Sequence, residues 1–286
     1  MKLPPFEYRS PGSLAEAVDI LAANPGAARP LAGGQTLLPI LAFRLSDPAI
    51  LVDLRRVPGL DRIDIGGDVI RIGAMVRWRD IEEDTRLRAA CPILPEAISH
   101  VAHYQIRNRG TVGGSLAHGD PASEMPGIAV LCDAEIEIAG RSGARTVPAA
   151  SFFTGPLTTV LEPDELIVGV KLPCWPTGRR WAFEEFALRR GDYAFAAIGV
   201  FYDHDDAGHA RNTHVAVIAA TDIPRRLKAA EAALDGRAVD EQTIAAAATA
   251  AAAEVNPPDD IHATAAYRRS LVGTLVERAL RRAQAR

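Results

Sequence analysis

The chain has 286 residues, of which 48% are hydrophobic and 24% are charged. Both fractions are close to the average for globular proteins, and they argue against a largely disordered chain, a coiled coil and a collagen-like fibre. The 32 basic and 36 acidic residues leave a net charge of -4. No excess of positive charge therefore indicates binding to nucleic acid.

The cysteines and the apolar stretches exclude further classes of protein. Cys91, Cys132 and Cys174 lie far apart and form no CxxC motif, so they predict neither a disulfide framework nor a metal or iron–sulfur site on this chain. The sequence has no apolar run of about 18 residues, the length that predicts a membrane span, and no signal peptide is evident. We therefore expect a cytoplasmic protein with no transmembrane segment, of a length ordinary for two or three domains.

The first part of the chain, residues 1–56, predicts a unit of strands and helices around a glycine pair. Ser13 and Glu16 have the spacing of a capping box and predict a helix that ends before Pro25. After it we expect a strand at 28–31, the glycine pair Gly33-Gly34, a second helix at 37–45 and a strand at 50–54.

Residues 57–176 predict a second unit, which begins with a hairpin around Gly66-Gly67-Asp68. A second glycine pair, Gly113-Gly114, lies in the middle of this unit. The helices expected here cover residues 78–86, 92–103 and 122–131, and the later strands cover residues 134–139, 145–147 and 166–172.

Residues 177–286 predict a third unit of a different kind. Three strands, at 180–188, 195–202 and 213–220, are followed by three helical stretches that run to the end of the chain. A run of strands followed by a run of helices favours an α+β fold over one alternating parallel sheet.

The two glycine pairs are the main chemical signal in the sequence. A backbone without Cβ atoms can approach an anion closely, and consecutive N–H groups in such a turn can bind phosphate oxygens. Two such turns could hold a pyrophosphate from opposite sides. The alternative is that each pair is simply a tight turn between a strand and a helix, because neither matches the Rossmann GxGxxG motif or a P-loop.

The residues around the pairs identify a ligand by resemblance. Residues 31–39 (LAGGQTLLP) and 103–121 (HYQIRNRGTVGGSLAHGDP) resemble the two FAD-binding segments of the molybdenum-hydroxylase flavoprotein family. This family includes the medium subunits of carbon monoxide dehydrogenase and the FAD domain of xanthine dehydrogenase. Further similar segments are 161–166, 189–194 and 266–269, so the resemblance covers nearly the whole chain.

The resemblance implies a fold and a set of cofactor-binding residues. The implied fold is α+β: a FAD-binding fold of the vanillyl-alcohol-oxidase-like type in two α/β subdomains, then a three-stranded antiparallel sheet packed with helices. The residues that it implies around FAD are Ala32, Gly33, Gly34, Gln35, Thr36, Leu37, Thr111, Gly113, Gly114, Ser115, Glu124, Ile167 and Tyr193. In the family the two segments hold the pyrophosphate through backbone N–H groups, and an acid at the position of Glu124 binds cofactor hydroxyls.

Three further positions are less settled by the resemblance. His118 and Asp120 are expected either to contact the cofactor or to have structural roles, Asp120 then being a helix N-cap ahead of Pro121. Glu184 departs from the family pattern, since xanthine dehydrogenases have a lysine near this point. The histidines, His118 included, favour structural or cofactor-neighbouring roles over a catalytic base, and we assign no catalytic or metal-binding residue.

The function implied is that of an electron-transfer flavoprotein subunit. In such an enzyme a large partner carries molybdenum–pterin, a small partner carries two [2Fe–2S] clusters, and the FAD of the medium subunit passes electrons to a final acceptor. We expect a heterotrimer, as a dimer of heterotrimers, and three scattered cysteines agree with clusters placed on another chain. The alternatives are a stand-alone flavin oxidoreductase that acts directly on a small substrate, and an assembly factor that no longer uses flavin.

Overall fold

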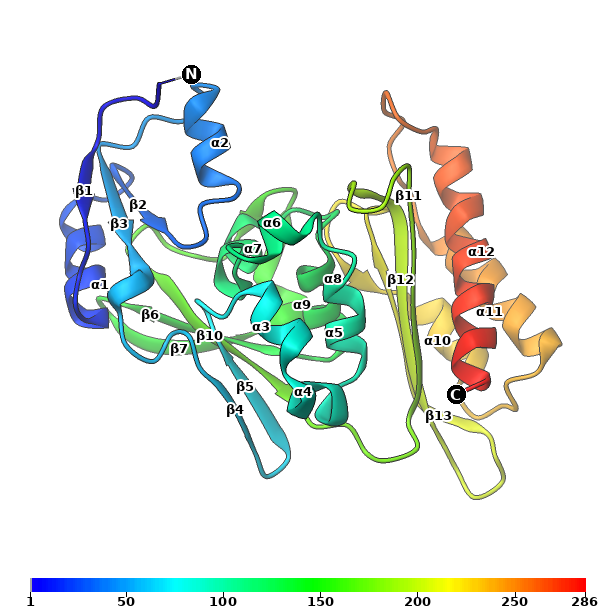
Figure 1. Cartoon of the computed structure of the whole chain (residues 1–286). Coiled ribbons are helices and arrows are strands. Elements are labelled where there is room, and N and C mark those ends of the chain that lie inside the picture. Colours follow the sequence, from blue (N-terminus) through cyan, green and yellow to red (C-terminus); the bar gives the residue numbers. More distant parts are fainter. Residues whose placement is uncertain (1) are drawn as a thin grey trace.

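A computed structural model describes residues 2–286 and consists of three main sheets that follow one another along the chain (Figure 1). The three-stranded sheet lies at one side, the five-stranded sheet with its helices lies in the middle, and the C-terminal sheet and helices lie at the other side. Among the helices of residues 2–286, none is long and apolar enough to cross a membrane.

The N-terminal sheet is parallel, with the strand order β1-β3-β2. Ser13 caps the first helix as predicted, because its side chain accepts a hydrogen bond from the backbone of Glu16. That helix buries Ala17, Val18 and Leu21 against the sheet. The elements are β1 (Glu7–Arg9), α1 (Leu14–Ala23), β2 (Ala28–Leu31), α2 (Leu37–Ala42) and β3 (Ile50–Asp53), followed by the short 3-10 helix Leu54–Arg56.

The middle sheet is antiparallel, with the strand order β4-β5-β10-β6-β7. Its strands are β4 (Ile63–Gly66), β5 (Val69–Gly73), β6 (Glu135–Gly140), β7 (Gly143–Pro148) and β10 (Leu166–Pro173). A small separate sheet holds β8 (Phe153–Gly155) and β9 (Thr158–Thr159). The hairpin predicted around Gly66-Gly67-Asp68 is confirmed as β4 and β5.

Seven short helices accompany this sheet, and all but α6 contribute buried side chains to one apolar core with it. They are α3 (Trp78–Glu83), α4 (Thr85–Ala90), α5 (Ile93–Ile98), α6 (Tyr104–Arg107), α7 (Val112–His118), α8 (Glu124–Leu131) and α9 (Ala149–Phe152). The helix predicted over 78–86 is divided at Asp84, whose side chain caps α4. The one predicted over 92–103 ends at Ile98, and Ala102 then has a positive φ of 42°.

The C-terminal sheet has the three predicted strands and a fourth of two residues, in the order β11-β12-β13-β14. Its strands and helices are β11 (Arg180–Ala187), β12 (Ala194–His204), β13 (Ala210–Ile218), β14 (Arg225–Arg226), α10 (Lys228–Leu234), α11 (Glu241–Glu254) and α12 (Ala265–Gln284). One face of the sheet packs on these three helices, and the other joins the core of the middle part. The division at residues 56/57 and 176/177 stays a prediction.

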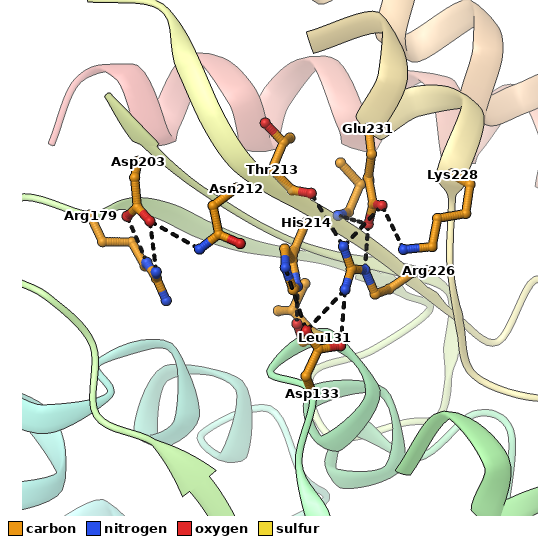
Figure 2. A network of polar contacts seen from close by, with 11 residues as sticks. Leu131, Asp133, Arg179, Asp203, Asn212, Thr213, His214, Arg226, Lys228 and Glu231 are labelled. Carbon is orange, nitrogen blue, oxygen red and sulfur yellow. Dashed lines mark hydrogen bonds and ion pairs between the residues drawn. The ribbon is translucent and has the colours of Figure 1, made fainter. Parts of the chain in front are cut away.

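A polar network fixes the C-terminal sheet to the end of α8 (Figure 2). The Arg226 guanidinium donates to Asp133 at 2.9 Å and to Glu231 at 2.6 Å. His214 Nδ1 lies 2.7 Å from the carbonyl oxygen of Leu131, the last residue of α8. Burial lowers the pKa of His214, with a further lowering contribution from the charge of Arg226. The network therefore holds α8 and the strands of the C-terminal sheet in one arrangement.

Candidate functional site

The two glycine segments, which lie far apart in the sequence, are in contact in the structure. A Cβ atom placed on Gly33 would lie 2.1 Å from the carbonyl oxygen of Arg109 and 2.9 Å from the Cα of Gly110. One placed on Gly114 would lie 3.7 Å from the Cβ of Ala32. The segments therefore approach as closely as the absence of a side chain permits.

The first segment offers unpaired hydrogen-bond donors. Gly34 has a positive φ of 72°, which turns the chain from β2 into α2. Within residues 2–286, the backbone N–H groups of Gly33, Gly34, Gln35 and Thr36 donate to no protein acceptor. The Thr36 side chain precedes α2 and makes no capping hydrogen bond. A row of free N–H groups beside a hydroxyl suits the oxygens of a phosphate.

The second segment is built differently from the turn expected there. Gly113 and Gly114 lie in the first turn of α7, and neither has a positive φ. The Thr111 side chain accepts a hydrogen bond from Gly114 N at 3.2 Å. The N–H of Gly113 donates to Ala74 O at 2.8 Å, and that of Ser115 donates to Thr111 O at 3.1 Å.

The second segment therefore contributes to the site by its close packing and offers few free backbone donors. A Cβ on Gly113 would lie 2.6 Å from the Cβ of Ala74, so glycine is needed there to pack α7 against the end of β5. Because its N–H groups are already paired, a clamp made of backbone donors from both segments is not what this structure presents. Ser115, whose hydroxyl could donate to a ligand, directly follows Gly114, the glycine that lies against Ala32 of the first segment.

The chain after α7 leads to a buried carboxyl group. Asp120 Oδ1 accepts from the backbone of Ala122 at 2.8 Å, whereas Ser123 is the residue that precedes α8, so the N-cap prediction for Asp120 is wrong. Glu124 begins α8 and is 9% exposed. Burial, and then the nearby carboxyl groups of Glu185 and Asp120, raise the pKa of Glu124 to about 8.

Glu185 is a residue of this site that sequence reasoning missed. It lies on β11, its side chain is 4% exposed, and its Oε2 has no hydrogen-bond partner. Its Oε1 lies 3.6 Å from Nδ1 of His100. The preceding residue, Glu184, which departs from the family pattern, instead accepts a hydrogen bond from Arg282 on α12 at 3.0 Å. Alternation of side chains along a strand places the two acids on opposite faces of β11, and the packing of the sheet decides which of them is inside.

The loop between β11 and β12 brings Tyr193 to the same place. Gly191 has a φ of 87°, and a Cβ there would lie 2.6 Å from Ala102 O and 2.7 Å from the His103 ring. Burial of its hydroxyl raises the pKa of Tyr193, and the neighbouring Asp120 carboxyl raises it further. The residue as a whole remains 63% exposed. The aromatic ring is thus accessible beside the buried acids.

Two more predicted residues lie at the edges of this region. Ile167 is buried on β10, at an irregularity of its pairing with β6. The next residue, Val168, accepts from Ala74 N at 3.2 Å, which connects β10 to the residue that packs on Gly113. His118 is the last residue of α7. Across residues 2–286 no group of three His, Cys, Asp or Glu side chains is arranged to hold a metal ion.

The residues present fit a phosphate-containing cofactor that also carries hydroxyl groups. The cradle of Gly33 and Gly34 is one that a Cβ would fill, and its N–H groups lack acceptors. The unpaired Glu185 Oε2 is a buried acceptor that lacks a donor. Pyrophosphate oxygens and sugar hydroxyls supply both kinds of missing partner.

Comparisons with known proteins place the whole chain in one family. A family model described as "FAD binding domain in molybdopterin dehydrogenase" matches residues 4–175, and one described as "CO dehydrogenase flavoprotein C-terminal domain" matches residues 181–283. The nicotine 6-hydroxylase medium subunit of Paenarthrobacter nicotinovorans is 39% identical, with 100% of both chains covered. The carbon monoxide dehydrogenase medium chain of Hydrogenophaga pseudoflava is 35% identical, with 99% of this chain and 98% of the relative covered.

Solved structures show the same likeness in three dimensions. A chain of carbon monoxide dehydrogenase from Hydrogenophaga pseudoflava superposes with a TM-score of 0.96 at 38% identity, with coverage of 100% of this chain and 99% of the other. A chain of quinoline 2-oxidoreductase from Pseudomonas putida 86 gives a TM-score of 0.95 at 39% identity, with the same coverage. The family that the sequence motifs indicated is confirmed, and the chain belongs to the FAD-binding flavoproteins of the molybdopterin dehydrogenases, with the carbon monoxide dehydrogenase type of C-terminal domain.

Proposed function

We propose that this chain is the FAD-binding electron-transfer subunit of a heterotrimeric molybdenum hydroxylase. The observation that carries the proposal is the contact between the two glycine segments, with the row of free N–H groups from Gly33 to Thr36 at that contact. Full-length likeness to chains named as medium subunits of nicotine 6-hydroxylase and carbon monoxide dehydrogenase supports it. The enzyme class is that of an oxidoreductase.

The residues of the site divide the work of binding among them. The first segment, residues 32–37, binds the pyrophosphate through its backbone N–H groups and the Thr36 hydroxyl. Ser115 of the second segment contributes a further contact to the pyrophosphate. Glu124 accepts hydrogen bonds from cofactor hydroxyls, and the exposed ring of Tyr193 covers the flavin beside Ile167. When bound, FAD supplies the electron-transfer chemistry, and the protein supplies binding, orientation and electrostatics.

The division of cofactors among subunits follows the same proposal. A large partner carries molybdenum–pterin and oxidises the substrate, and a small partner carries two [2Fe–2S] clusters. The three cysteines of this chain cannot ligate such clusters, since two are buried and none is part of a group that could hold a metal ion within residues 2–286. A dimer of heterotrimers and a cytoplasmic location stay predictions of the sequence analysis.

The proposal is tested by the flavin content of the complex and of two glycine variants. We expect about one non-covalent FAD per chain, released by denaturation and identified by its visible absorption spectrum. Gly33→Val would place its side chain against the backbone of Arg109, and Gly114→Val would place it 2.9 Å from Thr111 Oγ1, so both should lose FAD.

The matched control is Gly66→Ala, because nothing lies within 4 Å of a Cβ at that position. It should keep wild-type FAD occupancy, and circular dichroism should show that all three variants retain their helix content. Full FAD occupancy in both valine variants would mean that the pyrophosphate binds elsewhere. Substrate turnover by the isolated chain would favour a stand-alone flavin oxidoreductase instead.

A further inference from the structure

We propose that Glu185 is a further cofactor-binding residue, which together with Glu124 forms a buried carboxyl pair that holds one proton and receives the hydroxyl groups of FAD. The inference rests on the proposed function and adds a residue and a protonation state to it.

The Glu185 side chain has a buried acceptor that a ligand could pair. It is 4% exposed, and its Oε2 has no hydrogen-bond partner in the protein. A buried polar oxygen left unpaired costs roughly 1–3 kcal/mol. A ligand hydroxyl that donates to Oε2 removes this cost, and a sugar or ribityl chain is the part of FAD that carries such donors.

The neighbouring groups set the charge of the pair. On the α8 side lie Glu124 and, ahead of that helix, Asp120. On the side of α5 lies His100, 3.6 Å from Glu185 Oε1 and 35% exposed, so its imidazole keeps access to water. Tyr193, on the β11–β12 loop, is a further titratable group near Glu124.

Within residues 2–286, no arginine or lysine forms an ion pair with either carboxyl of the pair. Arg189 and Arg190, which follow β11, line a surface pocket on which His100 also lies. Among residues 2–286, the basic side chain within ion-pair distance of the two acids is His100, beside Glu185 Oε1. With no arginine or lysine to compensate them, two buried acids cannot both be charged at low cost, so one proton stays on the pair. Burial first, and the Glu185 carboxyl second, raise the pKa of Glu124 to about 8.

Glu184 shows that burial without a cationic partner is confined to one face of β11. It is adjacent to Glu185 on β11, yet it pairs with Arg282 on α12. The two acids differ in surroundings and not in chemistry, which makes Glu184 the matched control for Glu185.

Bound FAD should favour the singly protonated pair. The pyrophosphate brings two further negative charges, and the cofactor excludes water from the two carboxyl groups, so full ionisation of the pair becomes harder. By linkage, the affinity for FAD should fall as the pH rises past about 8, by up to about tenfold per pH unit. A site without this pair would show no such fall.

The test is a titration of FAD into the flavin-free full chain at several pH values between 6 and 9, followed by flavin fluorescence. Glu185→Gln puts a permanently neutral amide in place of one acid and should abolish the fall in affinity above pH 8. Glu184→Gln should keep the wild-type profile. At neutral pH, Glu185→Ala should bind FAD about tenfold more weakly, because an acceptor to the hydroxyl is lost.

The outcomes separate the failure of this inference from that of the proposed function. A Glu185→Gln chain with the wild-type pH profile, or a Glu185→Ala chain with wild-type affinity, overturns the role of Glu185 while FAD binding itself stands. Full FAD occupancy in Gly33→Val overturns the proposed site as a whole. Proton release or uptake on binding, measured by calorimetry in buffers of different ionisation enthalpy, gives the same answer without a substitution that could affect folding.

Discussion

Glu124 is a single residue whose chemistry the surrounding structure changes. In an unfolded chain its carboxyl would be ionised at neutral pH, but in the fold it is buried beside Glu185 and Asp120, and its pKa is about 8. An acid in this state has a hydrogen to donate as well as an oxygen that accepts. The family resemblance implies that Glu124 accepts hydrogen bonds from cofactor hydroxyls. In its protonated state Glu124 can also donate one.

Glu124 gives a prediction for the stability of the flavin-free chain. Because its pKa is raised from 4.5 to about 8 on folding, its contribution to stability is full below pH 4.5 and is lost as the pH rises through 8. The loss amounts to on the order of 5 kcal/mol. Glu124→Gln should remove most of this slope in urea unfolding experiments at a series of pH values.

The control for that experiment is Glu162→Gln, which changes an exposed glutamate. It should leave the pH dependence of the unfolding free energy as in the wild type. A Glu124→Gln chain that loses stability with rising pH as steeply as the wild type would show that Glu124 is already ionised in the folded protein.

At the scale of elements, the helix α7 carries the second glycine pair, which was expected in a turn. The first turn of this helix contains both glycines of the second pair, and it reaches the first segment because Gly114 faces Ala32 without a side chain between them. The start of the helix is fixed by Thr111, which is buried and accepts from the backbone of Gly114. The geometry of the second segment therefore depends on a helix cap.

Thr111→Val should test that cap with little change in volume. The variant leaves the Gly114 N–H without its acceptor, and we expect a loss of about 1 kcal/mol in the unfolding free energy, measured by urea denaturation. Thr249→Val, an exposed threonine in the middle of α11, should cost far less. Equal losses in the two variants would argue against a role for the cap.

At the scale of the whole molecule, the site depends on how the C-terminal sheet sits against the middle part. Glu124 belongs to α8 and Glu185 belongs to β11, so the charge of Glu185 acts on Glu124 only when these elements are held together. The network around Arg226, His214 and Asp133 holds the end of α8 on the same sheet (Figure 2). It is therefore a support for the candidate site at a distance from it.

Breaking this network should weaken both the fold and FAD binding. Arg226→Leu leaves the largely buried Glu231 without its main partner, which we expect to cost about 3 kcal/mol of unfolding free energy. The control is Arg281→Leu, whose partner Glu241 is 72% exposed, and which should cost less than about 1 kcal/mol. Thermal unfolding and FAD titration of both variants provide the measurement. Similar effects in the two variants would contradict the role of the Arg226 network in supporting the site.

The sequence by itself determined the parts that depend on local chemistry. The helix cap at Ser13, the hairpin at Gly66-Gly67, and the three C-terminal strands follow from residues close together in the chain, so short-range rules predict them. The capping box itself is only half formed, because the Glu16 carboxylate accepts from Gly12 N and not from Ser13 N. The glycine segments and the family they indicate also rest on short runs of residues, and the family is confirmed.

Only the tertiary structure decided which groups meet and in what state. The free N–H groups of the first segment, the paired ones of the second, and the burial of Glu185 beside Glu124 all depend on contacts between elements far apart in the sequence. The sequence does not show which of Glu184 and Glu185 faces the site, because a strand places neighbouring side chains on opposite faces and only packing decides which face is inside.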